Sequence, residues 1–317
     1  MRRPRSSFTF HPDAKVVRSH CHSSFGGPWP GFTDDERDEF VSDLFNACAF
    51  AGIDIAAFSV QPTGFDLIVD VPKKPRLSKA EMFRRFEAYT DPIFFGVESK
   101  RLKAGDAGSW ARLASRFGDL GAMLKSLKQK ATSRYHRNHG TSGSIWSNRY
   151  TRAFLQEGNA SRVLAAWMDH AAVRSGECST PDDDRFSTFG RSVGGDERAR
   201  AMITSLHAVD DAASAWRSVA KAYCDFVEDG TIPPNAPQSH RNKPLLTRAA
   251  FLRSEVPHFR GGMAVGDRAF VEALFELNRS EFGPERKSGA RRIIGQCDPD
   301  LWTLRNKTDL RKLSDRI

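Results

Sequence analysis

The 317-residue sequence lacks the features that mark secreted, zinc-binding and membrane-spanning proteins. Its five cysteines are far apart and form no C-x-x-C pair, so neither a structural zinc site nor a disulfide framework is expected. No apolar run approaches the roughly 20 residues needed to cross a bilayer, and none follows the basic N-terminus as in a signal peptide. These absences predict a cytoplasmic protein with reduced thiols and no membrane partner.

Acidic residues are fewer than basic ones. The chain has 48 Lys and Arg against 39 Asp and Glu, which gives a net charge of +9 at pH 7. This excess favours a polyanionic partner, because neutralising phosphates releases the counterions condensed around them. The hydrophobic content of 39% is ordinary for a globular protein, so a buried core is expected.

The order of the expected elements predicts an α+β fold. Residues 15–25 alternate like a strand, and Thr33–Gly52 combines an acidic capped start, apolar residues at helical spacing and a terminal glycine. Two apolar segments, 53–62 and 65–72, then meet at the turn signal Pro62-Thr63-Gly64. This beginning predicts an antiparallel sheet with helices on one face.

The rest of the chain is expected to be mainly helical, apart from an extended piece at 144–155. Segment 231–244 is rich in Pro and Asn and is predicted to be a linker. The predicted organisation is a first domain over 1–195, a helical extension over 196–230, the linker over 231–244 and a C-terminal helical module over 245–317.

A basic stretch without any acidic residue extends from Lys125 to Arg152. Tyr135, His136 and Trp146 supply stacking and hydrogen-bonding groups among its charges. A solvated helix surface usually carries charges of both signs, so the single sign predicts a nucleic-acid contact. The residues expected to contact phosphate are Lys125, Lys128, Lys130, Arg134, Arg137 and Arg149.

Four blocks resemble, in order and spacing, those of REP-associated tyrosine transposases. They are FSVQPTGFDLIVDVP (58–72), KSLKQKATSRYHRNHGTSGSIWSNRYTRAFL (125–155), AAWMDHAAVRSG (165–176) and DDDRFSTFGRSVGG (182–195). Residues 258–292 are similar to the C-terminal extension of larger members. The resemblance implies a ferredoxin-like antiparallel sheet backed by helices, as in HUH transposases, with a helical C-terminal extension.

The chemistry that the resemblance implies meets different residues in this chain. HUH nucleases bind a divalent metal through two histidines at i and i+2 of a strand, and a tyrosine on a helix attacks the phosphate. The histidine positions match Gly64 and Asp66, and the tyrosine position matches Trp167, whose indole is not a nucleophile. A polar residue near the tyrosine matches Ala171. The resemblance therefore predicts loss of strand cleavage, no catalytic residue, and no bound metal or other cofactor.

The leading interpretation is a DNA-binding protein of this family that no longer cuts its target, which would be hairpin, palindromic or single-stranded DNA bound by a homodimer. RNA stays open as well, because the aromatic residues of a ferredoxin-like sheet can stack unpaired bases.

Two other interpretations stay open. One is an active transposase with a rewired metal site, because His20 and His22 share a strand face that could approach Asp66. Tyr135 or Tyr150 would then have to act as the nucleophile. The other is a scaffold with no nucleic-acid role.

Overall fold

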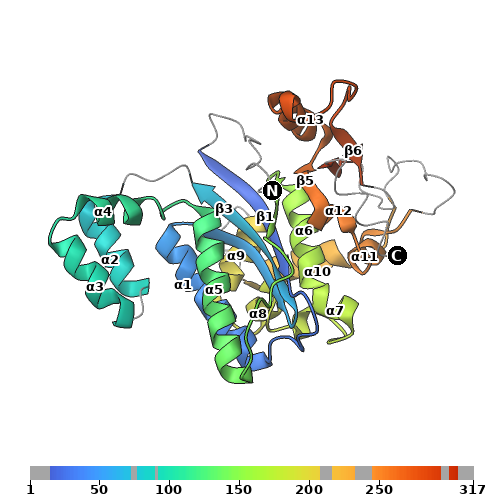
Figure 1. Ribbon diagram of the computed structural model, residues 1–317. Helices are drawn as coiled ribbons and strands as arrows, with labels where there is room; N and C mark the ends of the chain where they lie inside the picture. The colour runs from blue at the N-terminus through green and yellow to red at the C-terminus, as the bar shows by residue number, and fades with distance from the viewer. Residues whose placement is uncertain are drawn as a thin grey trace.

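A single sheet runs through the part of the chain that the computed structural model describes, which is residues 15–72, 77–89, 92–207, 216–232, 245–293 and 300–305 (backbone only for 92–96). It has seven strands in the order β2-β3-β1-β4-β5-β7-β6. The strands are β1 (Val16–Ser24), β2 (Asp54–Gln61), β3 (Gly64–Pro72), β4 (Thr151–Leu155), β5 (Gly262–Gly266), β6 (Ala290–Arg292) and β7 (Trp302–Arg305). Figure 1 shows this sheet surrounded by helices.

The first four strands have the ferredoxin-like order β2-β3-β1-β4, with antiparallel pairing throughout. The helix α1 (Asp34–Ala51) connects β1 to β2 and begins with a capping box between Thr33 and Glu36. It ends at Gly52, whose left-handed φ of 67° suits glycine. The turn at Pro62 and Thr63 joins β2 to β3. The α+β prediction with this sheet is confirmed.

Helices cover both faces of the sheet, not one as predicted. On one side, here called the α5 face, Leu67 packs in a core with α1 and with Leu124 of α5 (Leu120–His139). On the other, the α6 face, Ile68 packs with Leu164 of α6 (Asn159–Asp169). The reason is visible in β3, where residues 64–69 are all buried: a nearly continuous apolar run marks a strand covered on both sides.

Several further helices complete these two layers. Between β3 and α5 lie α2 (Lys79–Tyr89), α3 (Pro92–Lys103) and α4 (Ala107–Ala114), which form a lobe at the left of Figure 1. After α6 the chain forms α7 (Ala171–Ser175), α8 (Thr188–Val193), α9 (Glu197–His207) and α10 (Trp216–Val227). The α9 and α10 helices contribute Ile203 and Tyr223 to the same core as α6. Within the described ranges, no helix has both the length and the apolar character needed to span a bilayer.

The C-terminal module is not purely helical, which corrects the prediction. It does form α11 (Arg248–Leu252), α12 (Pro257–Gly261) and α13 (Arg268–Leu277), but it also contributes β5, β6 and β7 to the sheet. The strand β5 pairs in parallel with β4, about a hundred residues earlier in the chain. Strands this short carry little periodicity, so the sequence does not announce them. Most of the predicted linker, from residue 233 to 244, lies outside the described residues.

Candidate functional site

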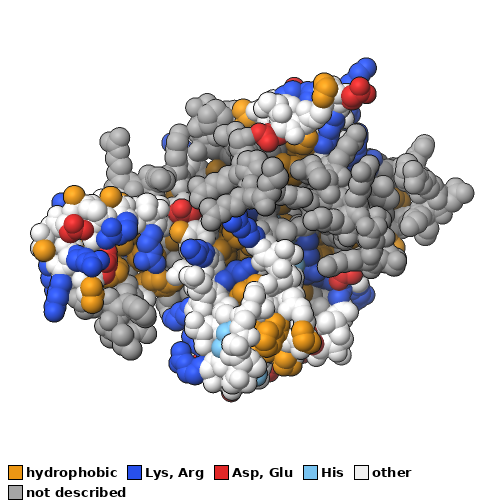
Figure 2. Space-filling view, in the orientation of Figure 1, with side chains coloured by type: hydrophobic (Ala, Val, Ile, Leu, Met, Phe, Trp, Pro, Cys, Tyr) orange, Lys and Arg blue, Asp and Glu red, His pale blue; other side chains and the backbone are white. Residues whose placement is uncertain are grey.

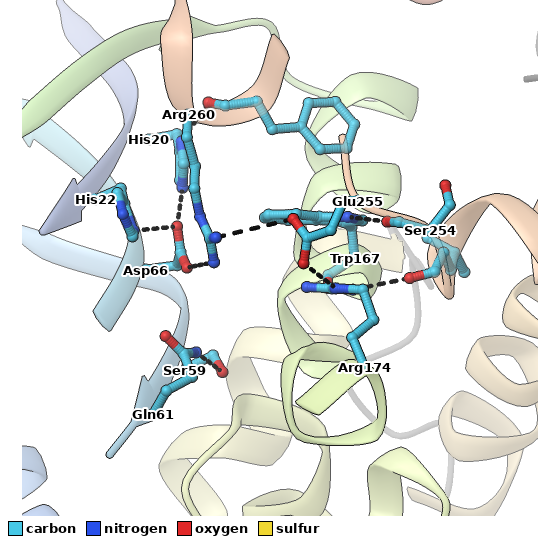
Figure 3. Close-up of polar contacts among 12 residues, drawn as sticks. His20, His22, Ser59, Gln61, Asp66, Trp167, Arg174, Ser254, Glu255 and Arg260 are labelled. Carbon is cyan, nitrogen blue, oxygen red and sulfur yellow. Dashed lines mark hydrogen bonds and ion pairs between the residues drawn. The ribbon is translucent and has the colours of Figure 1, made fainter. Parts of the chain in front are cut away.

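A buried carboxylate, Asp66, lies at the centre of a charged cluster on the α6 face. The pairing of β1 with β3 places His22 opposite Asp66 and His20 opposite Ile68, so both histidines reach the same carboxylate. His20 Nε2 lies 2.9 Å and His22 Nδ1 3.1 Å from Asp66 Oδ1. From α12, Arg260 Nη2 donates to Asp66 Oδ2 at 2.9 Å. Figure 3 shows these three side chains around Asp66.

The surroundings of Asp66 favour its ionised form. Burial alone would raise the pKa of this carboxyl, but the charges of His22 and Arg260 and the hydrogen bond with His20 outweigh it. The pKa of Asp66 therefore lies well below its usual range. His20 is fixed from behind, because its Nδ1 lies 3.0 Å from the carbonyl oxygen of Phe259. The cluster is thus a set of cationic and histidine side chains around one buried anion.

The structure brings together the three residues that formed the alternative metal site, His20, His22 and Asp66. As they are arranged, they do not fit a divalent cation. Both histidines approach Asp66 Oδ1. The Arg260 guanidinium binds the other oxygen, Oδ2, and already compensates the charge of the carboxylate. In the described parts of the chain, no group of three or more His, Cys, Asp or Glu side chains has an arrangement that could hold a metal ion.

The two tyrosines proposed as substitute nucleophiles lie on the other side of the sheet. Tyr135 is fully buried in the core of the α5 face and stacks on His139, with ring centres 4.1 Å apart. Tyr150 packs against the same core. Of the remaining tyrosines, Tyr89 contacts Ser126 and Tyr223 donates to Asp169. No tyrosine hydroxyl of the described chain contacts the Asp66 cluster, so none is placed to attack a phosphate there.

The four positions singled out by the resemblance nevertheless meet at one place. Gly64 and Ala171 line a pocket of about 480 Å³ together with His22 and Arg260. Trp167 is fully buried beside it, with the Arg260 guanidinium 4.9 Å from the centre of its ring. Its indole N–H donates to the carbonyl oxygen of Ser254 at 3.0 Å, so the ring is fixed behind the residues that line the pocket.

Two arginines of this pocket were not predicted. Arg174 lies 4.1 Å from the ring of Trp167, and its Nη1 donates to the carbonyl oxygens of Trp167 and Leu252. Its only signal in the sequence was its place in the block 165–176. Arg260 comes from the C-terminal module, 194 residues from Asp66, and no local pattern points to that contact.

Gly64 has a packing role that excludes a side chain. A Cβ at this position would lie 2.5 Å from the carbonyl oxygen of Ser23, in the neighbouring strand. Because the obstacle is backbone, Gly64→Ala is expected to lower the free energy of unfolding by about 1–3 kcal/mol. Urea denaturation measures the loss, with Gly283→Ala as control because a Cβ there meets nothing within 4 Å. Equal stability of the two variants would contradict this packing role.

Five of the six basic residues expected to contact phosphate lie on α5, and the sixth, Arg149, lies just before β4. Lys130 and Arg134 face α1, where both bind Asp43 at 2.7 Å and Arg134 also binds Glu39 at 2.9 Å. Their charges are therefore compensated within the fold. Lys125 and Lys128 point to the opposite side of the helix, because successive residues turn by about 100°.

Lys128 is held by neutral groups alone. Its Nζ donates to Ser23 Oγ at 2.7 Å and to the Asn148 carbonyl oxygen at 3.0 Å, and lies over the ring of Trp146. Burial lowers the pKa of this lysine to about 8. It is a cation without a carboxylate partner.

The contacts of Lys128 bring the segment before β4 alongside α5. Arg149 follows Asn148 directly and is exposed, and Arg152 is exposed with its Nε donating to Ser19 Oγ. Lys125, Arg137 and Arg149 form no ion pair in the described structure. Lys125, Lys128, Arg149 and Arg152 are here called the basic surface. Figure 2 shows Lys and Arg side chains gathered over this region of the molecule.

Comparisons with known proteins give one similarity. No protein-family model matches the chain, and no curated protein matches its sequence. Among solved structures, the chain is similar to a REP-associated tyrosine transposase bound to a REP hairpin, with 13% identity and a TM-score of 0.40. The match covers 62% of this chain and 87% of that one. So distant a likeness carries no argument about activity, and the ferredoxin-like order stands on the chain's own strand pairing.

Proposed function

We propose that this protein binds nucleic acid, in the form of hairpin or single-stranded DNA, through the basic surface and does not cut it. The observation that carries the proposal is that the cations of the basic surface have no carboxylate partner in the described structure. Lys125 and Arg149 are exposed without an ion pair, and Lys128 has only neutral acceptors. Cations that no carboxylate compensates attract a phosphate backbone.

Trp146 is partly buried below this surface, with its ring packed against Phe25 and Phe65 of the core. Its ring lies beneath the Lys128 ammonium, and its indole N–H donates to Thr132 Oγ1 at 2.9 Å. Trp146 therefore fixes the position of the Lys128 side chain in the basic surface. That a homodimer is the binding form stays a prediction of the sequence.

Neutralising two exposed cations tests the proposal. The variant Lys125→Gln/Arg149→Gln is expected to bind a DNA hairpin on the order of tenfold more weakly. The slope of log affinity against log salt should flatten by about 1.8, since each lost phosphate contact removes about 0.9. Fluorescence anisotropy at several salt concentrations measures both quantities, and an RNA hairpin of the same sequence tests the choice of DNA.

The control removes the same number of charges elsewhere. Arg84→Gln/Lys221→Gln changes one exposed side chain of α2 and one of α10, which pair with Glu81 and Asp225 of their own helices. It should bind nearly as well as the wild type. Equal losses in both variants would show that only net charge matters, and no salt-dependent binding by any of them would favour the scaffold interpretation.

The absence of cutting is proposed from the Asp66 cluster, where no tyrosine hydroxyl is placed and Arg260 occupies one carboxylate oxygen. Incubation with a hairpin oligonucleotide and Mg²⁺ or Mn²⁺ is expected to give no covalent protein–DNA adduct on a denaturing gel. The appearance of such an adduct would overturn this half of the proposal and favour the active transposase.

A further inference from the structure

The pocket beside Trp167 contains buried guanidinium groups whose hydrogen-bonding capacity is not used. The side chain of Arg174 is only 5% exposed, and its Nε and Nη2 are buried without a hydrogen bond in the described structure. The Nε of Arg260 is likewise buried without a hydrogen bond in the described structure. A buried donor without an acceptor costs about 1–3 kcal/mol, and folded proteins rarely keep several at one place without a ligand or ion to satisfy them.

Both arginines are directed into one space. Each lines the 480 Å³ pocket, and each guanidinium lies against the ring of Trp167. Figure 3 shows the nitrogen end of Arg174 pointing toward the side on which Arg260 meets Asp66. The indole therefore acts as a rigid support that holds two cationic groups at the same pocket.

The carboxylates around the pocket leave these donors incompletely matched. Asp66 is already shared by two histidines and Arg260, and Glu177 pairs with Arg37 at 3.1 Å. Glu255 approaches both arginines, but at 3.6 Å and 4.0 Å, and its side chain is 68% exposed. Glu255 is thus a loosely held anion, at distances longer than a hydrogen bond.

We propose that this pocket binds a phosphate group, which displaces Glu255 and accepts hydrogen bonds from Arg174 and Arg260. Guanidinium groups offer paired N–H donors that match the oxygens of phosphate. Burial lowers the pKa of Arg174 to about 10, so the side chain still carries its charge at neutral pH. The pocket is larger than a bare phosphate ion and leaves room for the group attached to a phosphate ester.

This site differs from the surface of the proposed function. It lies on the α6 face of the sheet, whereas the basic surface lies beside α5, so each can exist without the other. Free phosphate and the terminal phosphate of a nucleic-acid strand share the chemistry that the pocket recognises. The experiment therefore compares inorganic phosphate, a 5′-phosphorylated short oligonucleotide and the same oligonucleotide with a 5′-hydroxyl.

Isothermal titration of the full chain, with a metal chelator present, tests the proposal through two changes of opposite sign. Glu255→Gln removes the competing anion from an exposed position and should tighten phosphate binding about three- to tenfold. Arg174→Gln should weaken it at least tenfold. Because Arg174 also anchors two carbonyl groups, circular dichroism must confirm that this variant folds, and Glu255→Gln stands as the test if it does not.

The outcomes distinguish a phosphorylated strand end from a free phosphate ion, and they distinguish the phosphate pocket from the basic surface. Tighter binding of the 5′-phosphorylated oligonucleotide than of either comparison ligand identifies a strand end, and equal binding of inorganic phosphate identifies a free anion. Lys125→Gln/Arg149→Gln should leave the titration with inorganic phosphate unchanged even where hairpin binding is lost. No binding of inorganic phosphate at millimolar concentration, or no gain in Glu255→Gln, would overturn the phosphate pocket.

Discussion

Replacing Asp66 with alanine is expected to lower the free energy of unfolding by about 3–5 kcal/mol, a large share of the stability of a typical domain. The change removes the carboxylate that His20, His22 and Arg260 share. It leaves the Arg260 guanidinium without its nearest counter-ion and the buried His20 Nε2 without its hydrogen-bond partner. Breaking a buried ion cluster costs more than the loss of one contact, because the remaining charges keep their desolvation penalty.

The titration of Asp66 itself gives the effect no pH dependence between about 5 and 8. The pKa of Asp66 is lowered in the folded state, so its stabilising contribution is complete above the unfolded value and is lost only as the pH falls toward the folded one. Urea denaturation of wild type and Asp66→Ala at pH 8 measures the loss. Asp225→Ala, at an exposed ion pair with Lys221, serves as the control and should change stability by no more than about 0.5 kcal/mol. A loss for Asp66→Ala as small as that of the control would contradict the role assigned to the cluster.

Asp169, at the end of α6, is expected to have the opposite pH dependence. This carboxyl is fully buried and accepts hydrogen bonds from the Phe189 amide and the Tyr223 hydroxyl, at 3.1 and 2.8 Å. Burial outweighs these bonds and raises its pKa from 3.8 to about 7. Between these two values Asp169 binds more protons in the folded chain than in the unfolded one, so its contribution to stability falls as the pH rises. The contribution lost is on the order of 4 kcal/mol.

Asp169→Asn should remove most of this slope, since the amide does not titrate but keeps an oxygen for the Tyr223 hydroxyl. Other groups titrate in the same range, so the difference between the two chains reports Asp169. Burial raises the pKa of Asp184 to about 6, which adds to the decline, and lowers to about 4 the pKa of three histidines, which opposes it: His170, His207 and His258. Tyr223→Phe provides the matched comparison: it removes a hydrogen bond that favours the ionised carboxylate, so the decline should extend to higher pH. Chemical denaturation between pH 4 and pH 8 checks all three chains, and parallel curves for wild type and Asp169→Asn would refute a titrating Asp169.

Sequence patterns served well where one short segment decides the structure. The capping box at Thr33 and Glu36, the glycine that ends α1 and the turn at Pro62 and Thr63 are as predicted. Register arguments also held, because residues two apart on a strand share a face, which is how His20 and His22 both reach Asp66.

Two predictions were wrong in part: that helices cover one face of the sheet, and that the C-terminal module is helical. The strand β3 was interpreted with helices on one side only, although its run of buried residues already indicated burial on both. The strands β5, β6 and β7 are short and depend on pairing with distant segments, so their periodicity is too weak to distinguish them from helix.

By itself the sequence determined the early α+β elements and the single-sign charge of residues 125–152. The tertiary structure decided which charges are available. It pairs Lys130 and Arg134 with α1, leaves Lys125 and Arg149 exposed, and brings Arg260 to Asp66. The physical reason is that helical and strand patterns arise between neighbours in the chain, whereas the compensation of a charge depends on partners that only folding brings near.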